Sequence, residues 1–164
     1  MCSLLGRSKY QLFFGFLPLC TAISGNVGLQ ASSATRNAVM HGLVNHRESY
    51  RKWIIQEFGA ACYLGLVLGT FIGIAAFLLS DHSAFALTIA LSQFVSILSG
   101  GLTGTLAPLL CTHKFKINAQ KWEGPLVTAT QDLIGAFTMF IISYKLLQFL
   151  GPFHADPMDS CQAA

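Results

Sequence analysis

The chain has 164 residues, of which 53% are hydrophobic and only 10% are charged, and its mean hydropathy is +0.56. Soluble domains usually carry about 25% charged residues, so this composition indicates a protein whose main solvent is lipid. The formal net charge is +3, but the basic residues form no block of the kind that binds nucleic acid. The five cysteines form no CxxC pair that would indicate a zinc site.

Four stretches of the chain carry almost no charge, and we expect each of them to cross the membrane as a helix. A helix needs about 20 apolar residues to span about 30 Å of hydrocarbon. The sequence therefore predicts an all-α membrane protein, a single domain over residues 1–164 that folds as a bundle of about four transmembrane helices. The expected spans are residues 10–35, 58–79, 83–111 and 125–149.

The first stretch differs from an ordinary membrane helix because Pro18, Gly25 and Gly28 weaken it and because it is rich in polar residues. Polar groups at membrane depth are tolerated where they are buried in protein or line a watery cavity. Hydrogen bonding between helices and the lining of a hydrophilic path therefore both remain open. A signal peptide is a further alternative, but the length of the stretch favours a true span. The polar residues are Asn26, Gln30, Ser32, Ser33 and Thr35.

Small residues recur at four-residue spacing in the second and third stretches. Residues four apart share a helix face, and small side chains on that face let membrane helices approach closely. We expect close packing in a compact bundle, or a dimer interface, rather than chemistry. The third stretch is longer than a span requires, so we expect it to tilt, to bend at Gly100–Gly101 or to extend past the membrane. The small residues are Gly65, Gly69 and Gly73, followed by Ser92, Ser96, Gly100 and Gly104.

The fourth stretch contains Asp132, the one carboxylate inside a predicted span. A charged side chain at the bilayer centre costs at least about 2.5–3.5 kcal/mol, so it is seldom retained unless it faces a pore, a cation or a partner. An enzyme is not expected, because the predicted spans contain no second carboxylate and no histidine. Asp132 and the polar first stretch together favour a cation pathway.

Basic residues predict the orientation of the bundle. Loops 36–57 and 112–124 would share one side of a four-span protein, and both are basic, so we expect them to face the cytoplasm from the cell (inner or plasma) membrane. Arg7 and Lys9 would lie on the other side and do not fit this rule. Five scattered histidines are expected to be surface residues rather than metal ligands. They are His41, His46, His82, His113 and His154.

Several motifs resemble one known family. They are SGNVGLQ (24–30), EFG (57–59), GLTGTLAP (101–108) and PLVTATQDLIG (125–135). In this order, over about residues 12–150, they are similar to the transmembrane helices of MgtE-type magnesium and divalent cation transporters. The resemblance implies a homodimer in the lipid bilayer, without nucleic acid, that moves Mg²⁺ through a pore between its two subunits.

The resemblance also implies which residues form the ion site. The carboxylate at Asp132 would be the principal ligand of Mg²⁺. Five further residues match family positions that line or hold this site. They are Gly25, Gly28, Ser33, Thr128 and Gly135.

Two departures from the family pattern keep an alternative open. Leu29 stands where bacterial members commonly carry a polar Asn, and the family's first helix and its cytoplasmic domains have no counterpart in these residues. The alternative is a truncated, non-conducting membrane subunit or an assembly partner of an MgtE-like transporter. A further subunit would then supply the missing helix or regulatory domain.

Overall fold

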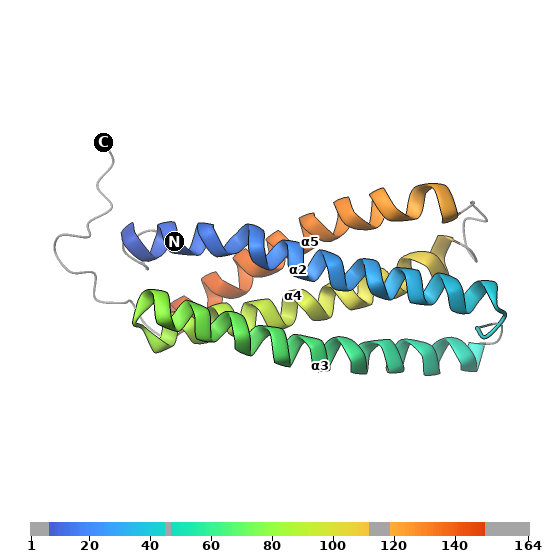
Figure 1. Ribbon diagram of the computed structural model, residues 1–164, viewed down its shortest axis with the longest axis horizontal. Coiled ribbons are helices and arrows are strands. Elements are labelled where there is room, and N and C mark those ends of the chain that lie inside the picture. The colour runs from blue at the N-terminus through green and yellow to red at the C-terminus, as the bar shows by residue number, and fades with distance from the viewer. Residues whose placement is uncertain (1–6, 45–46, 112–118, 150–164) are drawn as a thin grey trace.

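The described part of the chain consists of long α-helices. The computed structural model describes residues 7–44, 47–111 and 119–149, and these ranges contain no strand. The prediction of an all-α bundle of about four helices is confirmed. The helices are α2 (Arg7–Met40), α3 (Arg47–Ser80), α4 (Ser83–Leu110) and α5 (Ala119–Phe149) (Figure 1).

Three of these helices are long and apolar enough to cross a membrane by themselves. The corresponding segments are Gln11–Met40, Glu48–Ser80 and Ser83–Leu110. With 31 residues α5 is also long enough, but the side chains at its start lie outside the described residues, so it is not compared with the other three over its whole length. Its membrane crossing therefore stays a prediction.

The helix-weakening residues of the first stretch do not interrupt α2. The helix continues through Pro18, Gly25 and Gly28 as one element of 34 residues. Inside a bilayer no water is available for freed backbone groups, so a helix persists where it would break in water. In the same way α4 continues through Gly100–Gly101, and its 28 residues make it longer than a minimal span.

The connection between α2 and α3 is shorter than the predicted loop 36–57. The helix α2 ends in a turn in which Gly42 has φ of 70°, while the Leu43 N–H donates to the Ala38 carbonyl at 3.0 Å. Such a left-handed glycine satisfies the last carbonyls of a helix. Much of the predicted loop is thus helical, because both helices extend beyond the apolar spans. Of the second loop, residues 112–118 lie outside the described residues, and the rest belongs to α5.

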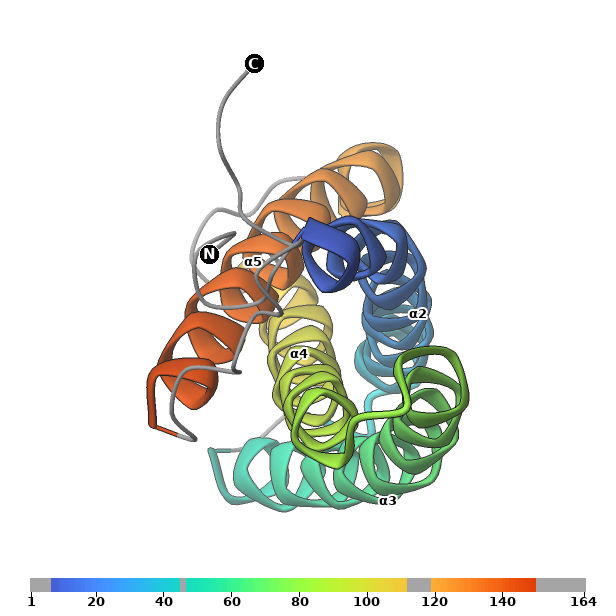
Figure 2. The same cartoon turned by 90° about the vertical axis from the view of Figure 1, so that its left-hand side faces the viewer.

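The helix α4 is the centre of the bundle. It packs along α2, α3 and α5, whereas α2 and α3 make few direct contacts (Figure 2). The α2–α3 connection lies at the same end of the molecule as the end of α4 and the start of α5, as predicted for the two basic loops (Figure 1). The α3–α4 turn, in which Asp81 has φ of 53°, lies at the other end.

The glycine pattern packs the helices closely, as predicted. A Cβ added to Gly73 of α3 would lie 2.7 Å from the Cβ of Ala90 on α4. A Cβ on Gly104 would overlap the carbonyl oxygen of Gly28 on α2. Both sets of small residues are used inside the protomer, so close packing explains them without a dimer interface.

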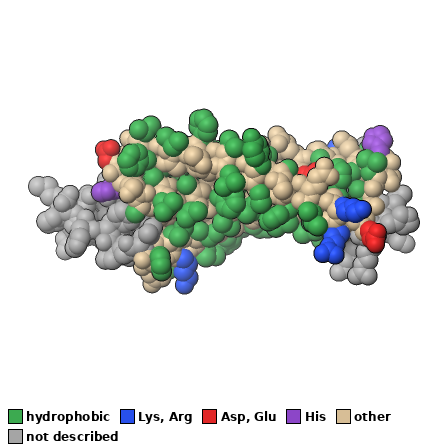
Figure 3. All heavy atoms as spheres, turned by 90° about the horizontal axis from the view of Figure 1, so that it is seen from below, with side chains coloured by type: hydrophobic (Ala, Val, Ile, Leu, Met, Phe, Trp, Pro, Cys, Tyr) green, Lys and Arg blue, Asp and Glu red, His purple; other side chains and the backbone are tan. Residues whose placement is uncertain are grey.

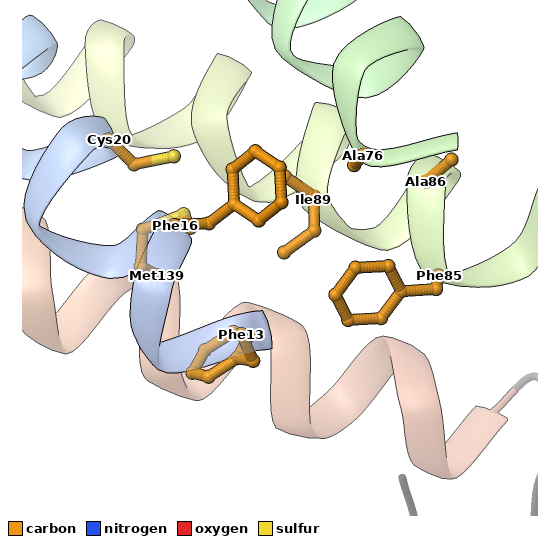
Figure 4. Close-up of a cluster of buried hydrophobic side chains, with 8 residues drawn as sticks. All are labelled: Phe13, Phe16, Cys20, Ala76, Phe85, Ala86, Ile89 and Met139. Carbon is orange, nitrogen blue, oxygen red and sulfur yellow. The ribbon is translucent and has the colours of Figure 1, made fainter. Parts of the chain in front are cut away.

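The largest buried hydrophobic cluster joins all four helices near the end of the bundle that holds the α3–α4 turn (Figure 4). The middle of the surface is mainly hydrophobic, and charged side chains gather towards the two ends in the view of Figure 3. This distribution is the one expected for helices that cross a bilayer. The cluster contains Phe13, Phe16, Cys20, Ala76, Phe85, Ala86, Ile89 and Met139.

Candidate ion site on the α2–α5 face

Asp132 lies at the surface of the protomer, beside the backbone of α2. Its side chain is exposed, and its Oδ1 atom is 3.4 Å from the position that a Cβ on Gly25 would occupy. Gly25 itself is buried, since α5 packs over it. The missing side chain of Gly25 therefore lets the carboxylate lie directly against the helix that carries the polar residues.

Polar side chains follow the outer face of α2, beginning at Asn26, the residue after Gly25. Asn26, Gln30, Ser33 and Asn37 are all exposed, and their spacing of four, three and four residues places them on one side of a helix. We call these four residues the polar stripe. The stripe begins in the middle of the apolar segment Gln11–Met40, so it presents amides and a hydroxyl at membrane depth.

Ser33 and Thr128 both lie on the same side of Asp132 along the bundle. The helices α2 and α5 run in opposite directions (Figure 1), so later residues of α2 lie near earlier residues of α5. Ser33 is exposed as part of the stripe, whereas Thr128 is half-buried one turn before Asp132. The structure thus extends the polar environment of the carboxylate towards the end that holds the α2–α3 connection.

Gly28 and Gly135 lie inside the bundle rather than on this face. A Cβ on Gly28 would be 3.1 Å from the carbonyl oxygen of Gly100, and one on Gly135 would be 3.0 Å from Ser24 Oγ. Both glycines therefore allow α2, α4 and α5 to pack closely. Their effect on Asp132 is indirect, because they set how near its helix approaches α2.

The face provides few groups that could bind a metal ion directly. Within the described ranges no three side chains of the His, Cys, Asp and Glu types lie together as a metal centre would require. His41 and His82 are exposed, while His46, His113 and His154 lie outside the residues whose side chains are described. One carboxylate surrounded by amides and hydroxyls suits a cation that keeps much of its water shell, as Mg²⁺ does.

Some features of the site were not expected from the sequence. Asn37 extends the polar stripe by one turn, and its spacing from Ser33 could have indicated this. Gln131 is fully buried although it adjoins the exposed Asp132. Leu29, the apolar departure from the family pattern, is half-buried one turn after Gly25.

The bundle has apolar helices, and at membrane depth it exposes a carboxylate and a polar stripe. These features define a class, that of helical membrane proteins with polar groups on two neighbouring helices. Comparison with known proteins identifies the family. The sequence pattern of the MgtE family, described as divalent cation transporter, matches residues 17–142. The chain therefore belongs to the MgtE family and is an integral membrane protein, as the sequence motifs suggested.

One curated relative has a name that states its activity. The magnesium transporter MgtE of Bacillus subtilis (strain 168) is 24% identical over 135 residues. The match covers 82% of this chain but only 30% of the relative. The chain thus spans less than a third of the length of that relative, and the shared part is the helical bundle.

Proposed function

We propose that two copies of this chain enclose a pathway for divalent cations, with Mg²⁺ as the principal substrate, and that Asp132 binds the ion. The observation that carries the proposal is the exposure of Asp132 against Gly25 of α2, where the exposed polar stripe begins at membrane depth. The family membership and the name of the relative from B. subtilis support a divalent cation, and magnesium in particular, as the substrate.

The cost of lipid exposure favours a second copy over this face. A carboxylate in contact with hydrocarbon costs at least about 2.5–3.5 kcal/mol, and the exposed amides of the stripe add to that cost. A second copy related by a two-fold axis would cover both and would bring two Asp132 side chains to one axis. Two carboxylates would balance the charge of one Mg²⁺ ion.

The chemistry of the face supports a hydrated ion. Mg²⁺ loses its water reluctantly and is usually bound through one or two carboxylates. The side chains of Asn26 and Ser33 can hydrogen-bond the water shell, and Thr128 adds a hydroxyl on the same side of Asp132. Gly25, Gly28 and Gly135 would hold the site by letting the helices approach.

Exposed basic residues support the proposed orientation. Arg51 and Lys52 of α3 lie near the α2–α3 connection and are exposed. By the positive-inside rule this end of the bundle would face the cytoplasm of a cell membrane. The ion would then pass from the end with the α3–α4 turn, along Asp132, to the polar stripe.

Flux through liposomes tests the role of Asp132. Purified protein with a Mg²⁺ indicator inside the vesicles is expected to show flux that Asp132→Asn lowers at least about tenfold, because the neutral amide removes the charge that binds the ion. Asp81→Asn is the matched control, since Asp81 is an exposed carboxylate in the α3–α4 turn. Equal flux in Asp132→Asn and the unchanged protein would remove Asp132 from the pathway. No flux from the unchanged protein would favour a non-conducting subunit.

Cross-linking tests the second copy separately. In a background without the native cysteines, Asn26→Cys is expected to form a disulfide-linked dimer in membranes, because the polar stripes of two copies would face each other. Leu66→Cys on the exposed face of α3 is the control, and it should stay monomeric. Cross-links at Leu66 alone would show that the copies meet through α3 and would contradict the proposed dimer.

A further inference from the structure

A second polar region lies inside the protomer, where α2, α4 and α5 meet. Six of its polar side chains have none of their surface exposed. Along α5 the region extends from Gln131 to Ser143, which is about 18 Å at 1.5 Å per residue. It therefore runs through more than half of a hydrocarbon layer of about 30 Å. We call it the buried polar file, and it consists of Ser24, Ser92, Gln93, Ser96, Gln131 and Ser143.

Only part of the buried polar file is joined by hydrogen bonds. The hydroxyls of Ser92 on α4 and Ser143 on α5 are 2.9 Å apart. The Gln93 side-chain amide donates to the carbonyl of Cys20 on α2 at 3.4 Å, a weak bond. The Ser24 hydroxyl donates to the Thr21 carbonyl of its own helix at 3.0 Å. The end of the file at the α3–α4 turn is thus better bonded than the part that contains Ser96 and Gln131.

Four polar atoms of the file have no hydrogen-bond partner among the described residues. They are Gln93 Oε1, Ser96 Oγ, Gln131 Oε1 and Gln131 Nε2. A buried polar atom without a partner costs about 1–3 kcal/mol, and folded proteins keep few of them. Exchanging the nitrogen and oxygen of the Gln131 amide does not provide a hydrogen-bond partner, because both atoms lack one.

These atoms lie close to backbone that glycine leaves open. The position of a Cβ on Gly100 would be 2.9 Å from Gln131 Nε2 and 2.6 Å from the Ser24 carbonyl oxygen. The position of a Cβ on Gly135 would be 3.4 Å from Ser96 Oγ. Where α2, α4 and α5 meet, a glycine on one helix thus lies close to polar atoms of another helix, first at Gly100 and then at Gly135. The polar atoms face each other across the junction rather than lipid.

We propose that the buried polar file binds ordered water. Water molecules hydrogen-bonded to Gln93, Ser96 and Gln131 would satisfy the four atoms and join α2, α4 and α5 through the middle of the membrane. Buried waters in proteins typically make about three hydrogen bonds to polar groups of this kind. The proposal stands whether or not Asp132 carries an ion, because it concerns buried side chains of α5 and not the exposed side chain of Asp132.

The set of atoms suits water better than a cation. Gln131 provides a donor as well as an acceptor, and water can serve both, whereas a cation would be repelled by the donor. A buried cation would also need a negative charge nearby. Asp132 is the nearest carboxylate in sequence, but its side chain is exposed on the outer side. The file is therefore a water site distinct from the ion site.

Hydroxyl-radical footprinting by X-rays tests the proposal on the whole chain in lipid nanodiscs. Bound water yields radicals where it sits, so a buried neighbour becomes oxidised although bulk water does not reach it. Met139 is fully buried, one turn after Gly135, and its thioether is readily oxidised. We expect Met139 to be oxidised in the unchanged protein and the rate to fall severalfold in Gln131→Leu and in Ser96→Ala.

Thr105→Val is the matched control for these variants. Thr105 is a buried hydroxyl of α4, but it already donates to the Gly101 carbonyl of its own helix at 2.8 Å. The control should leave the oxidation of Met139 unchanged. An unoxidised Met139 in the unchanged protein, or equal rates in all variants, would overturn the proposal.

Thermal unfolding provides an independent measurement. If the Gln131 amide were an unpartnered group in a dry junction, Gln131→Leu would remove its cost and raise Tm. With water bound, the substitution removes hydrogen bonds, and we expect Tm to fall. Ser96→Ala gives the same comparison with a smaller change in volume, in case Gln131→Leu does not fold. A rise in Tm for Ser96→Ala would contradict a water site at this hydroxyl.

Discussion

The polar stripe with Asp132 and the outer face of α3 are both exposed in the middle of the bundle, yet their chemistry is opposite. On α3 the exposed residues are large and apolar, and Phe71 and Leu66 expose 72% and 61% of their surfaces. On α2 the exposed residues near the middle of the segment Gln11–Met40 include Asn26 and Gln30, and Asp132 lies against the neighbouring Gly25. Exposure on α3 means contact with lipid, as it does for Leu133 and Phe137 of α5, whereas exposure of the polar stripe and of Asp132 calls for a polar partner.

The inner sides of the two helices differ less than their outer sides. Gly65 and Gly69 of α3 pack on α4 in the same way as Gly28 of α2 does. Both α2 and α3 therefore pack closely on α4. The two helices differ in the residues on their outer sides, which are apolar on α3 and include the polar stripe on α2. Three changes test this comparison, in decreasing order of expected effect.

An added carboxylate should distinguish the two faces most strongly. Leu66→Asp places a charge on the lipid-facing side of α3, and we expect it to disfavour insertion by about 3–4 kcal/mol. Asn26→Asp places the same charge at a similar depth on the polar stripe, where the loss should be clearly smaller. The measurement is the fraction of full-length chain that reaches the membrane with the expected topology. Equal losses at both positions would mean that the stripe also faces lipid.

An added methyl group tests the contact between α2 and α4. A Cβ on Gly104 would overlap the Gly28 carbonyl, so Gly104→Ala should destabilise the bundle by about 2–3 kcal/mol, the upper part of the range for overpacking. The matched control is Gly59→Ala on α3, where no atom lies within 4 Å of the added Cβ. There we expect a gain of about 0.5–1 kcal/mol from the better helix former. Denaturation in detergent measures both, and a stable Gly104→Ala protein would refute the close approach.

The smallest effect is expected at a side-chain hydrogen bond between α2 and α3. The Trp53 indole nitrogen donates to the Thr35 hydroxyl at 3.0 Å. Trp53→Phe keeps an aromatic ring but removes the donor, and it should cost about 1 kcal/mol in the same unfolding measurement. Thr70→Val is the control, because the Thr70 hydroxyl bonds only to the Leu66 carbonyl of its own helix. If Thr70→Val lowered the free energy of unfolding as much as Trp53→Phe does, the hydrogen bond between the helices would contribute no more than one within a helix.

The sequence predicted the helices and the polar first span, but not which way each polar side chain points. Gly135 follows Asp132 by three residues and was expected to line or hold the same site, yet Gly135 is buried and Asp132 is exposed. Residues three apart differ by about 60° around a helix, and the edge of the α4 contact falls between them. Gln131 turns inward for the same reason. The position of that edge depends on how three helices pack, which the spacing within one helix does not determine.

The central position of α4 has a consequence for the order of assembly during synthesis. The helix α2 touches α3 little and makes most of its contacts with α4, which follows α3 in the chain. A newly made α2–α3 hairpin therefore lacks the α4 surface that packs against Ser24. Because polar groups in hydrocarbon are costly, the nascent hairpin would gain most of its stability only when α4 leaves the translocon. A chain interrupted before α4 should be a preferred substrate of membrane quality control.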